Sequence, residues 1–97
     1  MSNKILVVGS INMDMVVKTA HIPRPGETVL GGVFFMNPGG KGANQAVAVA
    51  RLGGKAAFIG KIGDDIFGKQ SAHLFDQEGV DISGLAFDPE SPSGIAM

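Results

Sequence analysis

Apolar runs separated by polar, glycine-containing breaks predict strands and helices in turn along the chain. Short runs rich in branched side chains are typical of strands buried on both faces of a parallel sheet. Such runs occupy Lys4–Ser10, Ala56–Gly63 and Val80–Phe87. Two segments with helical spacing, 42–54 and 64–79, lie between them. Strands that alternate with helices predict an α/β fold with helices on the faces of a parallel sheet.

Both predicted helices carry signals at their ends. The first runs through alanines and valines and stops at Gly53–Gly54, because glycine favours a helix C-terminus. The second begins with Asp64 or Asp65 as the N-cap and ends at Gly79. Its predicted apolar face comprises Ile66, Phe67, Gln70, Leu74 and Phe75.

A hairpin of Met13–Lys18 and Thr28–Met36 is predicted between the first strand and the first helix. Pro25 and Gly26 suit the central positions of a type II turn within it. Alternation places apolar side chains on both faces of the second strand, namely Val29, Val33 and Phe35 on one and Leu30, Phe34 and Met36 on the other. The hairpin is either buried in its own core or a flap with one face over a ligand and the other against a partner subunit. The last four residues, 94–97, resemble the opening of one more strand.

Composition and charge narrow the class of protein. A chain of 97 residues forms one small domain at most, and its 44% hydrophobic and 18% charged residues fit a globular protein. The net charge is -1 and the basic residues are scattered, which argues against nucleic acid or a membrane as partner. There is no cysteine, and His21 and His73 stand alone, so no metal site is expected. The short apolar run near the N-terminus is no signal peptide, so a cytoplasmic protein is expected.

Residues 37–46, NPGGKGANQA, place three glycines and a lysine at a helix start. A phosphate-binding P-loop needs Ser or Thr after its lysine, but Gly42 follows Lys41. A dinucleotide fingerprint fails because Gln45 stands at its third small position. The bare backbone and Asn44, one turn in, can hydrogen-bond a polar ligand closely. The alternative is a loop that only lets the helix pack tightly.

The segment GSINMD places Asn12 and Asp14 on one face of an extended segment. They follow the carboxyl end of the first strand, the edge at which open α/β sheets bind ligands. A carboxylate and an amide side by side can hold two neighbouring hydroxyl groups. The alternative is a turn in which both side chains bond their own backbone.

The segments GSINMD, PRPGET, NPGGKGANQAVAVARLG and IGKIGDDIFG together resemble the N-terminal third of the PfkB family of sugar and nucleoside kinases. The resemblance covers the whole chain in order, and GGKGANQA is specific to the family. It implies the N-terminal part of an α/β/α parallel sheet with a protruding β-hairpin lid. Residues 1–12 and 38–92 would belong to the partial α/β core, and 13–37 and 93–97 to the partial lid.

The resemblance also implies an activity, the transfer of the γ-phosphoryl group of ATP to D-ribose, giving D-ribose 5-phosphate. Asp14 would bind two sugar hydroxyls, and the lid would close over the sugar and pair with the lid of a second subunit in a homodimer. Mg²⁺ and a monovalent cation, K⁺, are implied as cofactors beside ATP. The implied substrate-binding residues are Asn12, Asp14, Gly39, Gly40, Lys41, Asn44 and Ala96.

The family's catalytic base, an aspartate in a G-A-G-D motif, has no counterpart in this sequence. Asp64 and Asp65 lack the Gly-Ala-Gly lead. We therefore expect the chain to be the N-terminal segment of a longer kinase, inactive alone, with the base, the ATP site and the cation loop elsewhere. Its uncovered sheet edge and lid faces predict self-association. The alternatives are a kinase for fructose, adenosine or inosine, and a non-catalytic, lid-like binding module.

Overall fold

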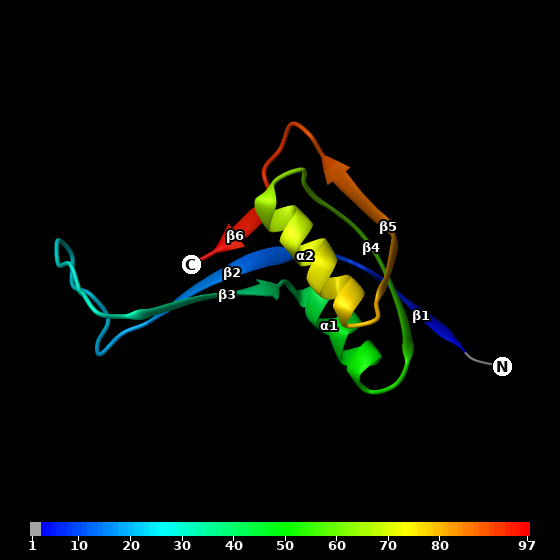
Figure 1. Cartoon of the computed structure of the whole chain (residues 1–97), viewed down its shortest axis with the longest axis horizontal. Helices are drawn as coiled ribbons and strands as arrows, with labels where there is room; N and C mark the ends of the chain where they lie inside the picture. The colour runs from blue at the N-terminus through cyan, green and yellow to red at the C-terminus, as the bar shows by residue number, and fades with distance from the viewer. Residues whose placement is uncertain (1–2) are drawn as a thin grey trace.

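The computed structural model describes residues 3–97, which form two three-stranded sheets and two helices (Figure 1). Residues 1 and 2 of the predicted core lie outside the described residues. The predicted order of elements is confirmed. The elements are β1 (Lys4–Val8), β2 (Asn12–Lys18), β3 (Val33–Gly39), α1 (Lys41–Arg51), β4 (Lys55–Gly63), α2 (Ile66–Gln77), β5 (Asp81–Asp88) and β6 (Gly94–Ala96).

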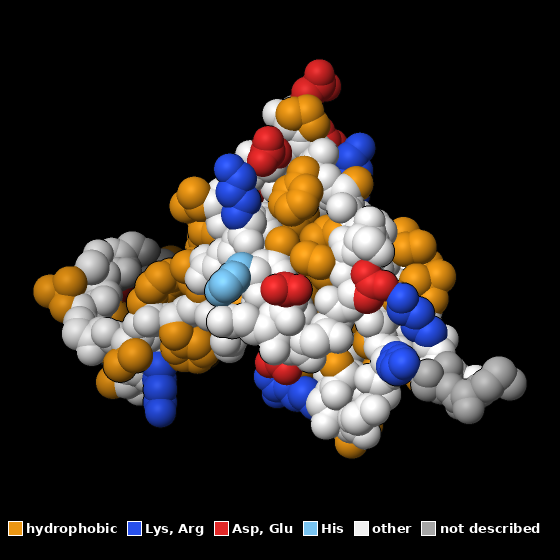
Figure 2. All heavy atoms as spheres, turned by 45° about the vertical axis from the view of Figure 1, so that its right-hand side comes forward, with side chains coloured by type: hydrophobic (Ala, Val, Ile, Leu, Met, Phe, Trp, Pro, Cys, Tyr) orange, Lys and Arg blue, Asp and Glu red, His pale blue; other side chains and the backbone are white. Residues whose placement is uncertain are grey.

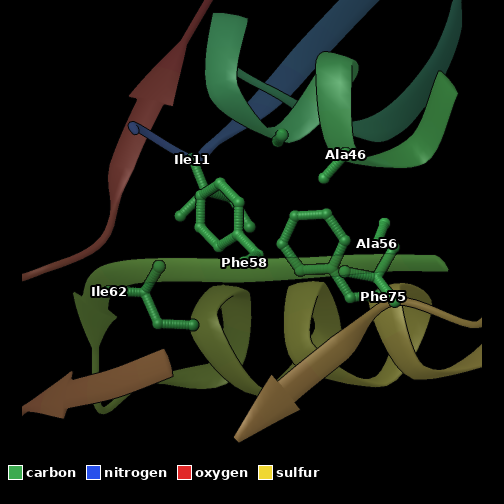
Figure 3. Packing of buried hydrophobic residues seen from close by; sticks show 8 residues of the cluster. Ile11, Ala46, Ala56, Phe58, Ile62 and Phe75 are labelled. Atoms are coloured by element: carbon green, nitrogen blue, oxygen red, sulfur yellow. The ribbon is translucent and has the colours of Figure 1, made fainter. Parts of the chain in front are cut away.

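The first sheet is parallel, in the order β1-β4-β5, and both helices pack against it to form one core. Phe58 of β4 and Phe75 of α2 are almost fully buried, with ring centroids 5.1 Å apart. Figure 3 shows the two rings side by side below Ala46 of α1, with Ile11 next to Phe58. Since a large side chain in such a core buries most of its surface, these two rings contribute heavily to stability.

The opposite face of this sheet is open within the described residues. Leu6, Val8 and Ile59 are 55%, 72% and 42% exposed, whereas Val7 packs against the core. The prediction that the first strand is buried on both faces is therefore wrong for this chain. The reason is its position, because β1 is an edge strand and both helices lie on one side of the sheet.

The ends of both helices follow the predicted signals. Asp65, not Asp64, is the N-cap of α2, and its carboxylate accepts a hydrogen bond of 2.8 Å from the Gly68 N–H. Gly53 and Gly79 have φ angles of 86° and 82°, which glycine adopts without strain, and each follows the end of a helix.

The buried face of α2 differs from the predicted one. Gly68, Ser71 and Phe75 are buried, while Ile66 is 75% exposed. Small residues allow the helix to approach β4 so closely that a Cβ on Gly68 would collide with the Gly63 carbonyl oxygen. The hydrophobic spacing alone could not reveal a contact made by a glycine.

The second sheet has the order β3-β2-β6, with β2 antiparallel to β3 and parallel to β6. The predicted turn is confirmed, because Gly26 has a φ of 80° and the Glu27 N–H donates to the Arg24 carbonyl at 2.9 Å. The predicted strand Thr28–Met36 is displaced, since β3 begins at Val33 and ends at Gly39. Gly31 has a φ of 81° and so interrupts the extended backbone before Val33.

The hairpin of β2 and β3 protrudes from the rest of the molecule, to the left in Figure 1. The pair Val16 and Phe35 on one face is 37% and 42% exposed, and the pair Val17 and Phe34 on the other is 59% and 58% exposed. Figure 2 shows hydrophobic side chains along this protruding part. A hairpin buried in its own core is therefore the wrong interpretation. The flap, and the division of the chain into core and lid at the predicted boundaries, stay predictions.

Neither helix of residues 3–97 is long and apolar enough to cross a membrane.

Candidate functional site

The turn after β1 lies against the first turn of α1. The Ala43 N–H donates to the Ser10 carbonyl at 3.1 Å. A Cβ on Gly42 would lie 2.9 Å from the Cα of Gly9, so the two backbones touch with no side chain between them. The two sequence motifs GSINMD and GGKGAN are thereby brought together at the carboxyl end of β1.

The glycines at the start of α1 fit closely against the chain itself. A Cβ on Gly39 would collide with the Asp14 carboxylate. Gly40 has a φ of 102°, and a Cβ there would lie 2.7 Å from the Ser10 carbonyl oxygen. Tight packing is thus one reason for this glycine run, as the alternative interpretation proposed. A ligand contact for the same glycines stays a prediction.

Asn12 and Asp14 lie half-buried on one face of β2, the middle strand between β3 and β6. Asn12 has a glycine as its register partner on each side, Gly39 of β3 and Gly94 of β6. The Asp14 carboxylate lies over Gly39, and a Cβ on Gly94 would lie 2.7 Å from the Asn12 side-chain oxygen. Among the described residues neither side chain bonds the backbone of its own turn, unlike Asp88, which accepts from the Glu90 N–H at 2.9 Å. Both polar groups therefore remain available to a ligand.

The other predicted site residues do not all lie beside this pair. Ala96 of β6 is the register partner of Asp14 and is exposed. Asn44 lines, together with Asp14, a cavity of about 790 Å³ between the hairpin and the two helices. Lys41 is exposed at the first position of α1 and is not among the residues that line this cavity. Of the predicted site residues, the structure thus places Ala96 and Gly39 next to Asp14.

An ion pair joins α1 to α2 at the far end of the cavity. Arg51 donates from Nε to Glu78 Oε2 at 2.9 Å and from Nη2 to Glu78 Oε1 at 2.5 Å. These bonds raise the pKa of Arg51 and lower that of Glu78. Both residues line the cavity at the C-terminal ends of the two helices, whereas Asp14 lies beside Gly39, before the start of α1.

Sequence reasoning missed Ser93 and the second role of Asp65. The Asp65 carboxylate accepts from the Ser93 N–H at 2.8 Å and from the Ser93 hydroxyl at 2.7 Å, as well as from Gly68. These bonds, led by that of the Ser93 N–H, hold the pKa of Asp65 below its usual value. The cap was readable from the sequence, but the partner far along the chain carried no local signal.

Residues 3–97 contain no group of three or more His, Cys, Asp or Glu side chains placed to hold a metal ion.

Comparisons with known proteins identify the family to which the chain is similar. The model of the "pfkB family carbohydrate kinase" matches residues 2–97. A ribokinase of Haemophilus influenzae is 45% identical over 97 residues, which are all of this chain and 32% of that protein. The chain thus spans about a third of the length of that relative.

Solved structures show the same fold. The Arabidopsis thaliana ribokinase complexed with ribose and ATP has a TM-score of 0.82 at 35% identity, over 98% of this chain and 31% of that one. A fructokinase from Xylella fastidiosa has a TM-score of 0.83 at 31% identity, over 99% of this chain and 28% of that one. Together with the family model, which spans both sheets and both glycine motifs, these likenesses show that the chain belongs to the pfkB family of carbohydrate kinases.

Proposed function

We propose that these residues form the sugar-binding part of an ATP-dependent kinase that converts D-ribose to D-ribose 5-phosphate. The observation that carries the proposal is the pair Asn12 and Asp14, which share one face at the carboxyl end of β1. Within residues 3–97, neither side chain bonds the backbone of the turn beside it. Gly39 and Gly94 have no side chains that would displace the Asp14 carboxylate or crowd the Asn12 side-chain oxygen. Such a pair suits a ligand with neighbouring hydroxyl groups.

The chemistry assigned to this part is orientation. The Asp14 carboxylate accepts hydrogen bonds from two sugar hydroxyls, and charge-assisted bonds of this kind are stronger than neutral ones. Asn12 and Asn44 add donors and acceptors, and Gly40 and Lys41 complete the contacts at the helix start. Phosphoryl transfer depends on positioning and charge stabilisation, so an oriented hydroxyl is a large part of catalysis.

The remaining machinery belongs, in this proposal, to the rest of a full-length protein in the cytoplasm. The catalytic base, the ATP pocket and the sites for Mg²⁺ and K⁺ lie there. The hairpin acts as a lid, with one apolar face over the sugar and the other against the lid of a second subunit. The exposed pairs Val16–Phe35 and Val17–Phe34 support this arrangement, because they offer an apolar surface on each side.

Ribose is favoured over other sugars by the likeness to ribokinases along the whole chain. The likeness to a fructokinase makes fructose the second candidate. The two are distinguished by comparing kcat/KM for ribose with kcat/KM for fructose, with ATP as the second substrate, in the full-length protein. A preference for fructose would overturn the choice of ribose and keep the kinase.

The role of Asp14 is tested by Asp14→Asn in the full-length protein. We expect kcat/KM for ribose to fall about 100-fold, because hydrogen bonds to a charged group contribute roughly 3 kcal/mol. Asp76→Asn, an exposed carboxylate on α2, is the control and should leave kcat/KM unchanged. Equal kcat/KM values for Asp14→Asn and the wild type would remove Asp14 from the site.

A further inference from the structure

The short strand β6 borders the proposed sugar site but has little packing to hold it. Gly94–Ala96 pairs with Asn12–Asp14, and all three of its residues are exposed. Ile95, its largest side chain, is 47% exposed. A three-residue edge strand without a buried side chain is marginally stable by itself. Something else must fix its position beside Asp14.

Ser93, directly before β6, is tied to the first sheet by hydrogen bonds. Its N–H donates to Asp65 Oδ2 at 2.8 Å, and its hydroxyl donates to Asp65 Oδ1 at 2.7 Å. The same hydroxyl oxygen accepts from the Gly63 N–H at 3.1 Å. Ser93 therefore joins β6 of the second sheet to the end of β4 in the first sheet and to the N-cap of α2.

Two glycines make room for this contact. A Cβ on Gly63 would collide with the Ser93 backbone nitrogen, and a Cβ on Gly68 would lie 3.1 Å from the Ser93 hydroxyl oxygen. The Gly68 N–H donates to the same carboxylate at 2.8 Å, which makes Asp65 both a helix cap and an anchor for Ser93. Because its bonding groups are donors to a carboxylate, the contact is charge-assisted.

We propose that Asp65 and Ser93 are positioning residues for the sugar site. They hold β6 against β2, so that the β6 backbone supports the Asn12 side chain and Ala96 lies beside Asp14. They act through β6 and touch no substrate themselves. The proposal rests on the proposed function, since it assigns the task of β6 within that same site.

The first test is Asp65→Asn in the full-length protein. An asparagine has one acceptor oxygen, so it can cap Gly68 or accept from the Ser93 N–H, but not both. We expect KM for ribose to rise about tenfold, the change in an equilibrium constant that the loss of one hydrogen bond produces. The KM for ATP and kcat should stay within about twofold, because β6 borders the sugar site alone.

The matched control is Asp64→Asn, the neighbouring carboxylate. Asp64 is half-exposed and contacts Lys69 at 3.9 Å, so its exchange should leave every kinetic constant unchanged. A second variant, Ser93→Ala, removes only the bonds of the hydroxyl and keeps the Asp65 cap. It should also raise KM for ribose and leave KM for ATP unchanged.

Hydrogen exchange supplies a readout that does not depend on catalysis. In Asp65→Asn the amides of residues 94–96 should exchange faster than in the wild type, while those of β4 keep their protection. Wild-type exchange at 94–96 together with a wild-type KM for ribose would overturn the inference. So would an equal rise in KM for both substrates, which indicates general loosening.

The two proposals fail in different ways. A wild-type protein that phosphorylates no sugar would overturn the proposed function and with it the task assigned to β6. Faster exchange at 94–96 in Asp65→Asn would then still assign the placement of β6 to Asp65. An active wild type with an unaffected Asp65→Asn variant would overturn only the inference.

Discussion

At the scale of single residues, the site depends on positions that have no side chain. The Asp14 carboxylate occupies the space that a side chain at Gly39 would need, and Gly40 combines a φ of 102° with the close Ser10 carbonyl. Gly53 also has a positive φ, but it has open space around its missing Cβ. The first two glycines therefore constrain the site, and the third only ends a helix.

This difference predicts the effects of two glycine-to-alanine exchanges. Gly39→Ala should displace the Asp14 carboxylate and raise the Kd for ribose in the full-length protein by about tenfold or more, the equivalent of one hydrogen bond. Gly53→Ala should lower the free energy of unfolding by roughly 1 kcal/mol through backbone strain and leave the Kd unchanged. Calorimetric titration with ribose and thermal unfolding measure the two quantities. A normal Kd for Gly39→Ala would contradict the tight fit of the carboxylate.

At the scale of elements, carboxylates fix the ends of strands and helices. A hydrogen bond from the Lys4 side chain leads the contacts that lower the pKa of Asp81 at the start of β5. The Glu90 N–H leads those that lower the pKa of Asp88 at the end of the same strand. The pKa of Asp65, at the start of α2, is lowered in the same way, chiefly by the hydrogen bond from the Ser93 N–H. All three stabilise the fold as carboxylates.

The protein should consequently lose stability in acid. A carboxylate whose pKa is lower in the folded state contributes its full stabilisation above the unfolded pKa, about 3.9 for aspartate, and loses it as the pH falls toward the folded value. Asp88→Asn should therefore be less stable than the wild type at neutral pH, and the difference should shrink in acid. Thermal unfolding at a series of pH values measures this. A difference independent of pH would exclude the charge of Asp88 as the cause.

Local signals predicted the elements well, and long-range contacts account for most of what they missed. Glycine and aspartate marked the ends of both helices because caps are local. The start of β3 was misplaced because the apolar residues from Thr28 to Met36 look like one continuous strand, whereas Gly31 interrupts the extended backbone. The exposure of β1 and the Asp65–Ser93 contact depend on which elements become neighbours. For the site, the alternation of side chains along a strand predicted that Asn12 and Asp14 share one face. The close fit of Gly39 and Gly94 against these two side chains depends on how the strands pair, which the sequence does not show.

At the scale of the whole molecule, residues 3–97 leave two apolar surfaces uncovered. One is the open face of the first sheet, with Leu6, Val8 and Ile59. The other is the hairpin, which exposes apolar side chains on both of its faces. Exposed apolar surface of this kind favours contact with another chain or with more of the same protein.

The 97-residue chain by itself should accordingly self-associate. Sedimentation at increasing concentration should show a rising mean mass, because β1 offers both an open edge and an apolar face. Val8→Lys should weaken this association, whereas Gln77→Lys, at an exposed position of α2 on the covered side of the sheet, should not. A mass that stays at 10.0 kDa over the whole range would contradict this prediction.

The contact between Gly39 and the Asp14 carboxylate has a consequence for inheritance. Two positions far apart in the sequence share one volume, so a side chain cannot be added at 39 while Asp14 keeps its carboxylate there. A larger residue at 39 becomes acceptable only in a lineage in which a smaller side chain has already replaced Asp14, and with it the carboxylate that we propose binds sugar hydroxyls. A carboxylate at position 14 therefore requires glycine at position 39.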